Sequence, residues 1–410
     1  MRRVVITGLG AVSPIGNDTN ALWHSVQQGR CGITPITRYD TTGRSVTLAA
    51  EVKDFDPEIY IDKRAARRMD LYTQYAVYAA CEAMQDSGFT GEIPDAKRFG
   101  VIVSSGIGGL GTIQQETEKG LEKGFDRVSP FFIPMAISNL AAGNIAIRFG
   151  LKGMCSCVVT ACAGGTNAIG DAFHYVRDGY ADVMLAGGAE ASITPLGIGG
   201  FTSMKALTTA TDPLRASIPF DKERSGFVMG EGAGILVLEE LEHARKRGAH
   251  IYCEVAGYGA NCDAYHITAP LEDGSGAADC MTMAMGDAGI GPEAIDYINA
   301  HGTSTHLNDA GETRAVRLAF GLHAKTLCIS STKAMTGHLL GASGAVEGVI
   351  LAKAVEEGFV PATVNYKEPD PECDLDIVAN EGRKQVLHYA MSNSLGFGGH
   401  NASIIFKKYE

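Results

Sequence analysis

The sequence predicts an α/β protein whose structural unit is present twice in one chain. Runs of β-branched residues that end in glycine-rich turns alternate with amphipathic or small-residue helical stretches along the 410 residues. This alternation is typical of buried strands covered by helices. Glycine makes up about 12% of the chain against a usual ~7%, which indicates many tight turns and close backbone approaches.

Five pairs of short motifs indicate the duplication. They are VITGLGA at 5–11 with EVAGYGA at 254–260, AMQDSG at 83–88 with AMGDAG at 284–289, VIVSSG at 101–106 with YINAHG at 297–302, CVVTACAGG at 157–165 with CISSTKAMTG at 328–337, and VMLAGG at 183–188 with AMSNSLGFGG at 390–399. The order is kept throughout. We therefore predict two homologous halves, residues 1–250 and 251–410, whose strand ends face one another, where ligands tend to bind.

Charge and hydropathy exclude two classes of protein. There are 35 Lys and Arg residues against 47 Asp and Glu, and the net charge of -12 argues against a nucleic-acid binder. The longest uncharged stretches, residues 128–147 and 153–170, are interrupted by Pro, Asn, Ser, Thr or Gly. Neither stretch is typical of a membrane span.

The cysteines and the first residues predict a cytoplasmic protein. Ten cysteines are spread over a long chain, a pattern more typical of reduced thiols than of a disulfide framework. The opening VVITGLGAVSPIG has an apolar run broken by glycines and lacks an A-x-A-like cleavage site. We expect it to form the first strand rather than an export signal.

Cys162 lies in a segment that predicts a turn between a strand and a helix. An apolar strand is expected at Val158–Thr160, Gly164 and Gly165 permit a sharp turn, and an amphipathic stretch follows. Unpaired backbone N–H groups at the start of a helix would stabilise a thiolate there. Most cysteines are simply buried, so the turn makes Cys162 a candidate nucleophile and no more.

Two histidines follow strands in the second half. His301 comes directly after the strand expected in AIDYIN, and the strand LCISS at 327–331 leads on to His338 and then to a helix over 341–355. A lone histidine is usually a surface or a satisfied core residue. Two of them in turns that face Cys162 indicate a site.

A thiol with two imidazoles suits acyl transfer. Cys162 would carry the acyl group while two neutral histidines stabilise an enolate oxygen on a second substrate. The backbone N–H of Phe397, with that of Cys162, is a candidate oxyanion hole, and Thr303 and Thr305 supply hydroxyl groups. This chemistry needs no metal and no nicotinamide.

Competing motifs are incomplete. Gly8 and Gly10 begin a dinucleotide fingerprint, but Ser13 stands where its third glycine is required. The sequence contains no P-loop and no G-x-S-x-G. Cys155 and Cys157 have no second Cys or His pair at zinc-finger spacing, so no metal site is predicted.

These residues and motifs resemble the β-ketoacyl-acyl carrier protein synthases of the condensing-enzyme, thiolase-like family, especially the synthase II type. The motifs are VVITGLGAVSPIG, TACAGGTNAIGDA around Cys162, PFDKERSGFVMGEGAG from Pro219, NAHGTST at His301, STKAMTGHLLGASGAVE at Lys333 and His338, and SNSLGFGGHN. The resemblance covers essentially the whole chain. It implies a five-layered α-β-α-β-α fold with two mixed sheets, and condensation of an acyl group with malonyl-acyl carrier protein in fatty acid elongation, without a cofactor.

The resemblance also implies residue roles. Cys162 would accept the acyl group, His301 and His338 would support decarboxylation of the malonyl thioester, and Lys333 would tune the site. Thr303 and Thr305 match positions that bind the phosphopantetheine arm. Phe397 matches a gate, Ile107 a residue that limits the acyl pocket, and Phe132 one that reaches the partner subunit's acyl tunnel.

Departures from the family pattern are small. His306 follows NAHGTST where proline is common, and His400 replaces the more familiar threonine. A homodimer is expected, with Phe131 and Phe132 in its interface region.

An acidic acyl carrier protein would be repelled by a chain of net charge -12 unless a local basic patch attracts it. The run IDKRAARRMD supplies Lys63, Arg64, Arg67 and Arg68, which share faces at helical spacing. Lys205 is a basic position that the family shares. A solvated helix face is the usual reason for such a run, but docking is favoured because the rest of the chain is acidic.

Two other functions stay open at this point. An aromatic polyketide ketosynthase subunit shares the Cys-His-His set and differs in needing an inactive partner subunit. A non-catalytic scaffold is disfavoured because Cys162, His301, Lys333 and His338 occur together.

Overall fold

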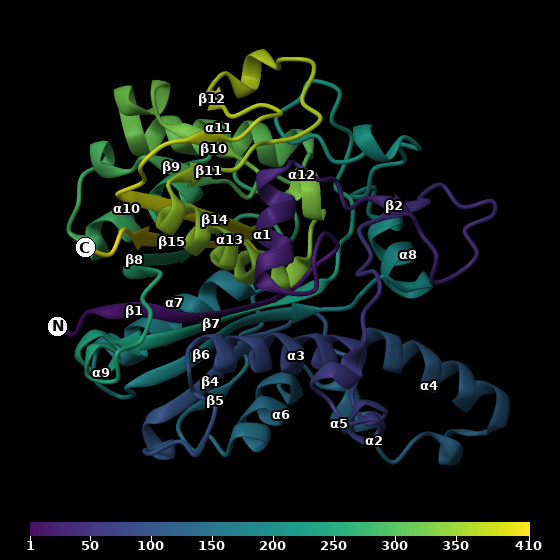
Figure 1. Cartoon of the computed structure of the whole chain (residues 1–410). Coiled ribbons are helices and arrows are strands. Elements are labelled where there is room, and N and C mark those ends of the chain that lie inside the picture. Colours follow the sequence, from purple (N-terminus) through teal and green to yellow (C-terminus); the bar gives the residue numbers. More distant parts are fainter.

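The computed structural model describes residues 1–410 and contains one large sheet with helices on both sides (Figure 1). The strands of the first half are β1 (Val4–Val12), β4 (Phe99–Ser104), β5 (Cys155–Ser156), β6 (Val183–Glu190) and β7 (Gly232–Glu240). Those of the second half are β8 (Cys253–Cys262), β9 (Tyr297–Asn299), β10 (Cys328–Ser330), β12 (Asp376–Ile377), β14 (Tyr389–Gly396) and β15 (His400–Lys407). Two small ribbons pair β2 (Thr34–Pro35) with β3 (Leu48–Ala49), and β11 (Phe359–Val360) with β13 (Arg383–Lys384).

The helices surround these strands. They are α1 (Thr19–Gln27), α2 (Lys63–Ala66), α3 (Leu71–Asp86), α4 (Leu110–Lys123), α5 (Phe132–Ala136), α6 (Leu140–Phe149), α7 (Gly164–Arg177), α8 (Pro195–Ser203), α9 (Leu241–Lys246), α10 (Ser275–Ala288), α11 (His306–Phe320), α12 (Lys333–Thr336) and α13 (Ser343–Glu357). No helix is long and apolar enough to cross a membrane.

The strand order is the same in both halves. The first half runs β1-β7-β6-β4-β5 and the second runs β8-β15-β14-β9-β10, with β12 added at its edge. Each motif pair from the sequence falls on corresponding elements, for example on β1 and β8, and on the ends of α3 and α10. The repeated motifs therefore occupy the same places in two similar sheets. The division at residues 250 and 251 itself stays a prediction.

The two predicted sheets are joined into one. Val4, Val5 and Ile6 of β1 pair with residues 253–255 of β8, so the hydrogen-bonded ladder runs through all 11 strands. The expectation of two separate mixed sheets is corrected in this detail, because the first strands of the halves lie edge to edge. Away from this seam the halves diverge and enclose helices.

The layers follow from the burial of the helices. α7 and α13 lie between the two parts of the sheet, α3 covers the outer face of the first half, and α10 covers that of the second (Figure 1). α13 is buried along nearly its whole length, as its largely apolar and small residues require of a central helix. All nine residues of β1 are buried as well.

The strand expected at Val158–Thr160 is absent. β5 ends at Ser156 after pairing with Val101 and Ile102 of β4, and the chain then enters a turn in which Ala161 has a φ of +49°. β5 is the edge of the sheet. Its one neighbour, β4, ends at Ser104, so in this register Val159 and Thr160 lie beyond the end of β4 and have no strand within this chain to pair with.

Candidate active site

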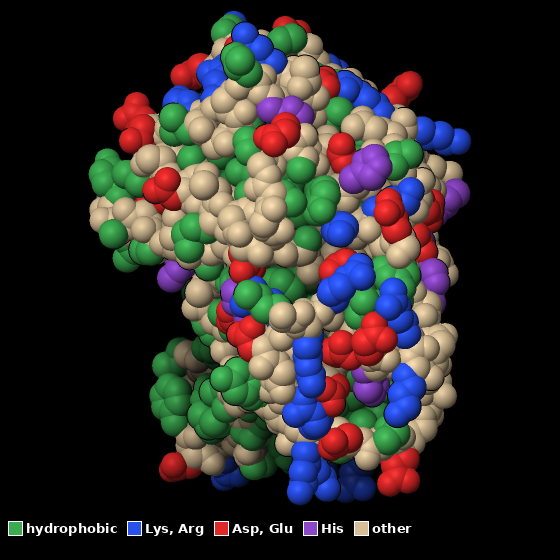
Figure 2. Space-filling model, turned by 90° about the vertical axis from the view of Figure 1, so that its left-hand side faces the viewer, with side chains coloured by type: hydrophobic (Ala, Val, Ile, Leu, Met, Phe, Trp, Pro, Cys, Tyr) green, Lys and Arg blue, Asp and Glu red, His purple; other side chains and the backbone are tan.

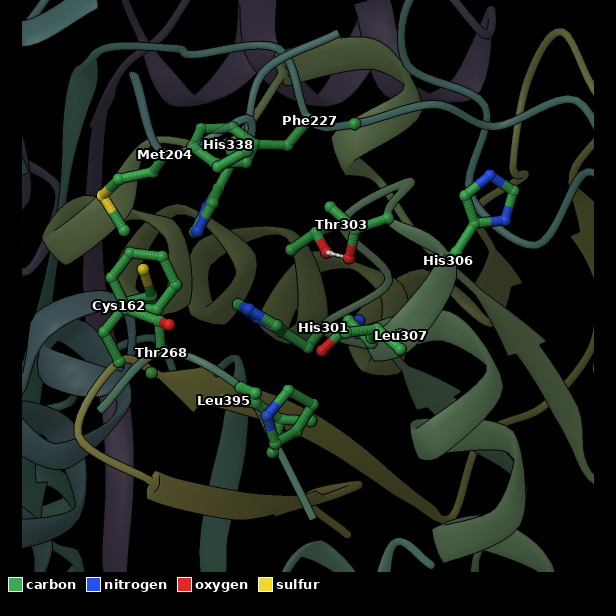
Figure 3. Close-up of a pocket in the computed structure, with 18 of the residues that line it drawn as sticks. Cys162, Met204, Phe227, Thr268, His301, Thr303, His306, Leu307, His338 and Leu395 are labelled. Atoms are coloured by element: carbon green, nitrogen blue, oxygen red, sulfur yellow. Dashed lines mark hydrogen bonds between the residues drawn. The ribbon is translucent and has the colours of Figure 1, made fainter. Parts of the chain in front are cut away.

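Segments from both halves meet at one cavity of about 370 Å³. Cys162 lies in the turn before α7, His301 follows β9, His338 follows α12, and Phe397 lies in the turn between β14 and β15. Figure 3 shows the rings of His301 and His338 pointing into the same space beside Cys162. The sequence prediction that the three side chains come together is thus confirmed in geometry, while their catalytic roles stay predictions.

The Cys162 thiol is deeply buried, with 8% of the residue exposed. Burial raises the pKa of this thiol to about 12, while the charge of Lys333 and the backbone N–H groups of Phe397 and Cys162 favour the thiolate. Cys162 precedes the first residue of α7 by two positions. The expected thiolate stabilisation is therefore outweighed by burial, and the resting thiol is protonated.

His301 and His338 form a neutral pair. Their ring centroids lie 5.1 Å apart and the ring planes are nearly perpendicular, at 87°. Burial lowers the pKa of both imidazoles well below the usual range, and the charge of Lys333 lowers it further. Both rings are therefore uncharged at neutral pH, as the enolate-stabilising role requires.

The backbone of each histidine is anchored on both sides. The N–H groups of His301 and Gly302 each donate to the Glu312 carboxylate at 2.8 Å. The His338 N–H donates to the Val228 carbonyl, and the His338 carbonyl accepts from the Gly230 N–H, both at 2.8 Å. Sequence analysis missed Glu312, because an acid among the mixed polar and apolar residues of α11 carries no signal that distinguishes it.

Ser343, which sequence analysis also missed, orients the His338 ring. Its hydroxyl lies 2.8 Å from Nδ1 of His338 and accepts a hydrogen bond from the Leu339 N–H at 2.8 Å. The ring nitrogen is the remaining polar neighbour for the hydroxyl proton. Donation to Nδ1 leaves the ring proton on Nε2, where it can be donated.

Lys333 is buried behind the histidines and does not line the cavity. Its ammonium group pairs with the Glu347 carboxylate. Lys333 acts on the site through its field, which favours the thiolate of Cys162 and the neutral forms of both histidines.

The cavity walls contain hydroxyl and aromatic groups. The hydroxyls of Thr303 and Thr305 lie 3.0 Å apart and both residues line the cavity (Figure 3). The Phe397 ring is 6.2 Å from that of Phe201, between centroids. His306 also lines the cavity, at the start of α11 and on the side away from Cys162 in Figure 3.

Two models of one family match the chain in succession. The model of the Beta-ketoacyl synthase N-terminal domain matches residues 1–244, and that of the C-terminal domain matches residues 252–367. The chain belongs to the β-ketoacyl synthase family.

Curated relatives match this synthase over its full length. A protein from Synechocystis sp. (strain ATCC 27184 / PCC 6803 / Kazusa), named 3-oxoacyl-[acyl-carrier-protein] synthase 2, is 52% identical over 410 residues that cover 100% of this chain and 99% of the relative. A protein of the same name from Staphylococcus aureus (strain COL) is 53% identical over 409 residues, with 100% and 99% covered.

Solved structures of ketosynthases share the fold. The ishigamide ketosynthase/chain length factor has a TM-score of 0.93 at 37% identity, and a Beta-ketoacyl synthase from Burkholderia phymatum STM815 has 0.93 at 36%. A type II polyketide ketosynthase in complex with its acyl-carrier protein has 0.89 at 37%. All three alignments cover 100% of both chains. The thiolase-like fold class is confirmed.

Two of the synthase's predicted pocket residues lie outside the cavity. Ile107 packs against the apolar cluster that contains Cys162, but it does not line the open space. Phe132 is the first residue of α5 and does not reach the cavity of its own subunit. Its predicted role in a partner's tunnel stays a prediction.

The predicted docking cations are accessible on the synthase. Lys63, Arg64, Arg67 and Arg68 are all exposed, although α2 is only four residues long and ends at Ala66. Lys205 is exposed too and lines the cavity. The helical spacing expected for these four cations extends over one turn only. Asp62 caps the start of α2, and the chain leaves the helix after Arg67.

Proposed function

We propose that this synthase elongates acyl chains in fatty acid synthesis, as a 3-oxoacyl-[acyl-carrier-protein] synthase of type 2. It transfers an acyl group to Cys162 and condenses it with malonyl-acyl carrier protein, giving β-ketoacyl-acyl carrier protein and CO2. The observation that carries the proposal is the convergence of a buried thiol and two neutral imidazoles in one cavity. Full-length relatives of that name support the choice of substrate.

The first half-reaction is acyl transfer. The Cys162 sulfur attacks the thioester carbonyl, a new C–S bond forms, the bond to the carrier sulfur breaks, and the carrier leaves as a thiol with the proton that Cys162 releases. The N–H groups of Cys162 and Phe397, which favour negative charge at this sulfur, are proposed to stabilise the oxyanion.

The second half-reaction is decarboxylative condensation. The bond between the malonyl carboxylate and the α-carbon breaks, and CO2 leaves. The electron pair of this bond forms an enolate, whose oxygen accepts hydrogen bonds from His301 and His338. The enolate carbon then attacks the acyl carbonyl, a C–C bond forms, and the C–S bond to Cys162 breaks. Cys162 leaves as a thiolate and takes up one proton from water to restore the resting thiol. Nε2–H of His338, set by Ser343, is a suitable donor for this oxygen.

The remaining cavity residues would hold the carrier's arm and the acyl chain. Thr303 and Thr305 offer hydroxyls to the phosphopantetheine amides, Phe397 gates the passage, and Ile107 limits the acyl pocket. The reaction draws only on the thiol, imidazole and backbone groups, so we propose that no metal or organic cofactor takes part. The cytoplasmic location also stays a prediction.

We further propose that acyl carrier protein docks on Lys63, Arg64, Arg67, Arg68 and Lys205. A related ketosynthase structure contains its acyl-carrier protein. These cations are exposed, and Lys205 lines the cavity. They would steer an acidic partner that the net charge of -12 otherwise repels.

A homodimer is proposed as the active unit. Figure 2 shows apolar side chains gathered at the lower left edge of the molecule, in its N-terminal half. Exposed apolar residues between 121 and 159 are Leu121, Phe125, Phe131, Ile133, Ile137, Ile147, Met154 and Val159. In a dimer, the unpaired edge of β5 in one copy would pair with the same edge in the other copy, and each copy would cover the apolar face of the other.

The decisive experiment is an elongation assay with malonyl-acyl carrier protein and acyl donors of several lengths. The wild-type protein should form β-ketoacyl product, and Cys162→Ser should form none, because the acyl group has no thiol to accept it. Cys162→Gln should still decarboxylate malonyl-carrier protein, as an imitation of the acylated state. Intact-mass spectrometry that finds the acyl group on another cysteine would contradict the proposal.

A polyketide ketosynthase subunit is the second candidate, favoured by the type II polyketide ketosynthase structure at 37% identity. The full-length relatives at 52% and 53% identity favour the fatty acid enzyme. Elongation by the purified protein without a second type of subunit would decide for the first candidate.

A further inference from the structure

Glu190 is a fully buried carboxylate at the end of β6 for which the proposed reaction has no use. It accepts five hydrogen bonds at 2.8 to 3.3 Å, from the backbone N–H groups of Gly106, Ile107 and Gly341 and from the hydroxyls of Ser105 and Ser192. Both carboxylate oxygens are occupied by donors. A carboxylate that accepts so many hydrogen bonds holds the segments that carry the donors in position.

Two backbone segments meet at this carboxylate with no space between them. A β-carbon on Gly106 would lie 2.9 Å from Oε2 of Glu190, and one on Gly341 would lie 2.4 Å from the backbone nitrogen of Gly106. Only glycine fits at both positions. Segments 105–107 and 339–341 are therefore held against each other through Glu190.

Both segments carry side chains of the apolar cluster around Cys162. Ile107 follows Gly106 and packs against that cluster, and Leu340, which precedes Gly341, belongs to it. Ile193, three residues after Glu190, is a third member. An acyl chain attached to Cys162 would extend among these side chains, because they pack in the same apolar cluster as Cys162, and their backbone positions would then determine the space it finds.

We propose that Glu190 is a positioning residue for acyl-chain selection, which fixes the Ile107 and Leu340 segments at the acyl pocket. This inference rests on the proposed function, because it assumes that an acyl chain is held on Cys162. A carboxylate suits the role because it only accepts hydrogen bonds. An amide of the same shape would turn an NH2 group toward backbone N–H donors.

Glu82 provides a matched control. It is a largely buried carboxylate that accepts from the N–H groups of Ala11 and Thr19 at 2.8 and 2.7 Å, and burial raises its pKa to about 7, as it does for Glu190. Glu82 lies on α3 and does not line the cavity. Replacing it disturbs buried hydrogen bonds of the same kind without touching the pocket.

The experiment compares Glu190→Gln with Glu82→Gln. For each variant, the melting temperature is measured together with kcat/KM for hexanoyl and tetradecanoyl donors. Both variants should have a lower melting temperature. Only Glu190→Gln should lower the ratio of long-chain to short-chain kcat/KM, by roughly tenfold, because apolar pockets distinguish substrates that differ slightly in size by factors of this order. A hexanoyl chain is shorter and contacts fewer of these side chains than a tetradecanoyl chain, so its kcat/KM should change less.

An unchanged ratio in Glu190→Gln, with a lowered melting temperature, would overturn the inference and leave Glu190 a purely structural group. If Glu190→Gln does not fold, Ser105→Ala removes one donor from the same carboxylate and should shift the ratio in the same direction by a smaller factor. An unchanged ratio there would overturn the inference too. Failure of the proposed function is a different result, because the wild-type protein would then form no β-ketoacyl product from either donor.

Discussion

At the scale of single residues, burial decides the charge of the thiol and the two imidazoles in the cavity. It raises the pKa of Cys162 and lowers that of His301 and His338, so all three are neutral at rest. Lys333 supplies a nearby positive charge that opposes the first shift and adds to the other two. The site is thus prepared for charge that appears only during the reaction.

The raised thiol pKa predicts the pH dependence of alkylation. Below its pKa of about 12, the thiolate fraction of Cys162 should rise about tenfold per pH unit. The rate of iodoacetamide labelling should therefore climb from pH 7 to pH 9 without a plateau. Peptide mass spectrometry follows this rate, with the exposed Cys262 as an internal reference. A plateau below pH 8 would show a thiol activated at rest.

Loss of one histidine donor should slow decarboxylation. His338→Ala in the Cys162→Gln background should release CO2 from malonyl-carrier protein on the order of a hundredfold more slowly, because one of two hydrogen bonds to the enolate is lost. His388→Ala, at an exposed position away from the cavity, is the control. Decarboxylation at the parent rate in His338→Ala would refute the assignment.

At the scale of elements, strand ends and short turns place the chemistry. β9 and β10 were expected from AIDYIN and LCISS and are present. Gly164 and Gly165 were expected to form the turn before the helix, but they are the first two residues of α7, and the residue with positive φ in the turn is Ala161. The strand expected at Val158–Thr160 fails, because a β-branched run forms a strand only where a neighbour offers backbone partners. The length of α2 was likewise overestimated, since a charge pattern does not reveal where a helix ends.

Arg67 and Arg68, which directly follow α2, predict how carrier-bound substrates respond to charge. The double variant Arg67→Glu, Arg68→Glu should raise KM for carrier-bound acyl donors, and more so at low salt, because exposed charges act most strongly there. Acyl-CoA or short thioester donors should be unaffected. The control is Arg245→Glu with Lys246→Glu, two exposed cations on α9, far from α2 in Figure 1. Equal losses with both donor types would mean that these arginines support folding.

At the scale of the whole molecule, the duplicated architecture brings the two halves of the site together. The turn with Cys162 comes from the first half, and the turns with His301, His338 and Phe397 come from the second. α7 and α13 pack between the two parts of the sheet, so the start of one central helix faces that of the other. The duplication recognised from five motif pairs is the basis of this convergence.

The exposed apolar face predicts a dimer at this same scale. Val159→Asp, at an exposed position beyond the end of β5, should shift the protein toward monomers and lower its activity, because a buried charge without a partner is costly. Leu322→Asp, at an exposed position in another region, should leave the dimer intact. Analytical ultracentrifugation measures both. A wild-type protein that is monomeric and fully active would contradict the proposal.

The sequence by itself determined the fold class, the repeat and the identity of the reactive side chains, because these depend on local periodicity, turn chemistry and motif order. The tertiary structure alone decided what surrounds those side chains. The seam between β1 and β8 and the backbone donors on Glu190 join residues that are far apart in the sequence, and the protonated state of Cys162 depends on exclusion of water. Burial and hydrogen-bond partners are properties of the packed chain, and no local stretch of sequence contains them.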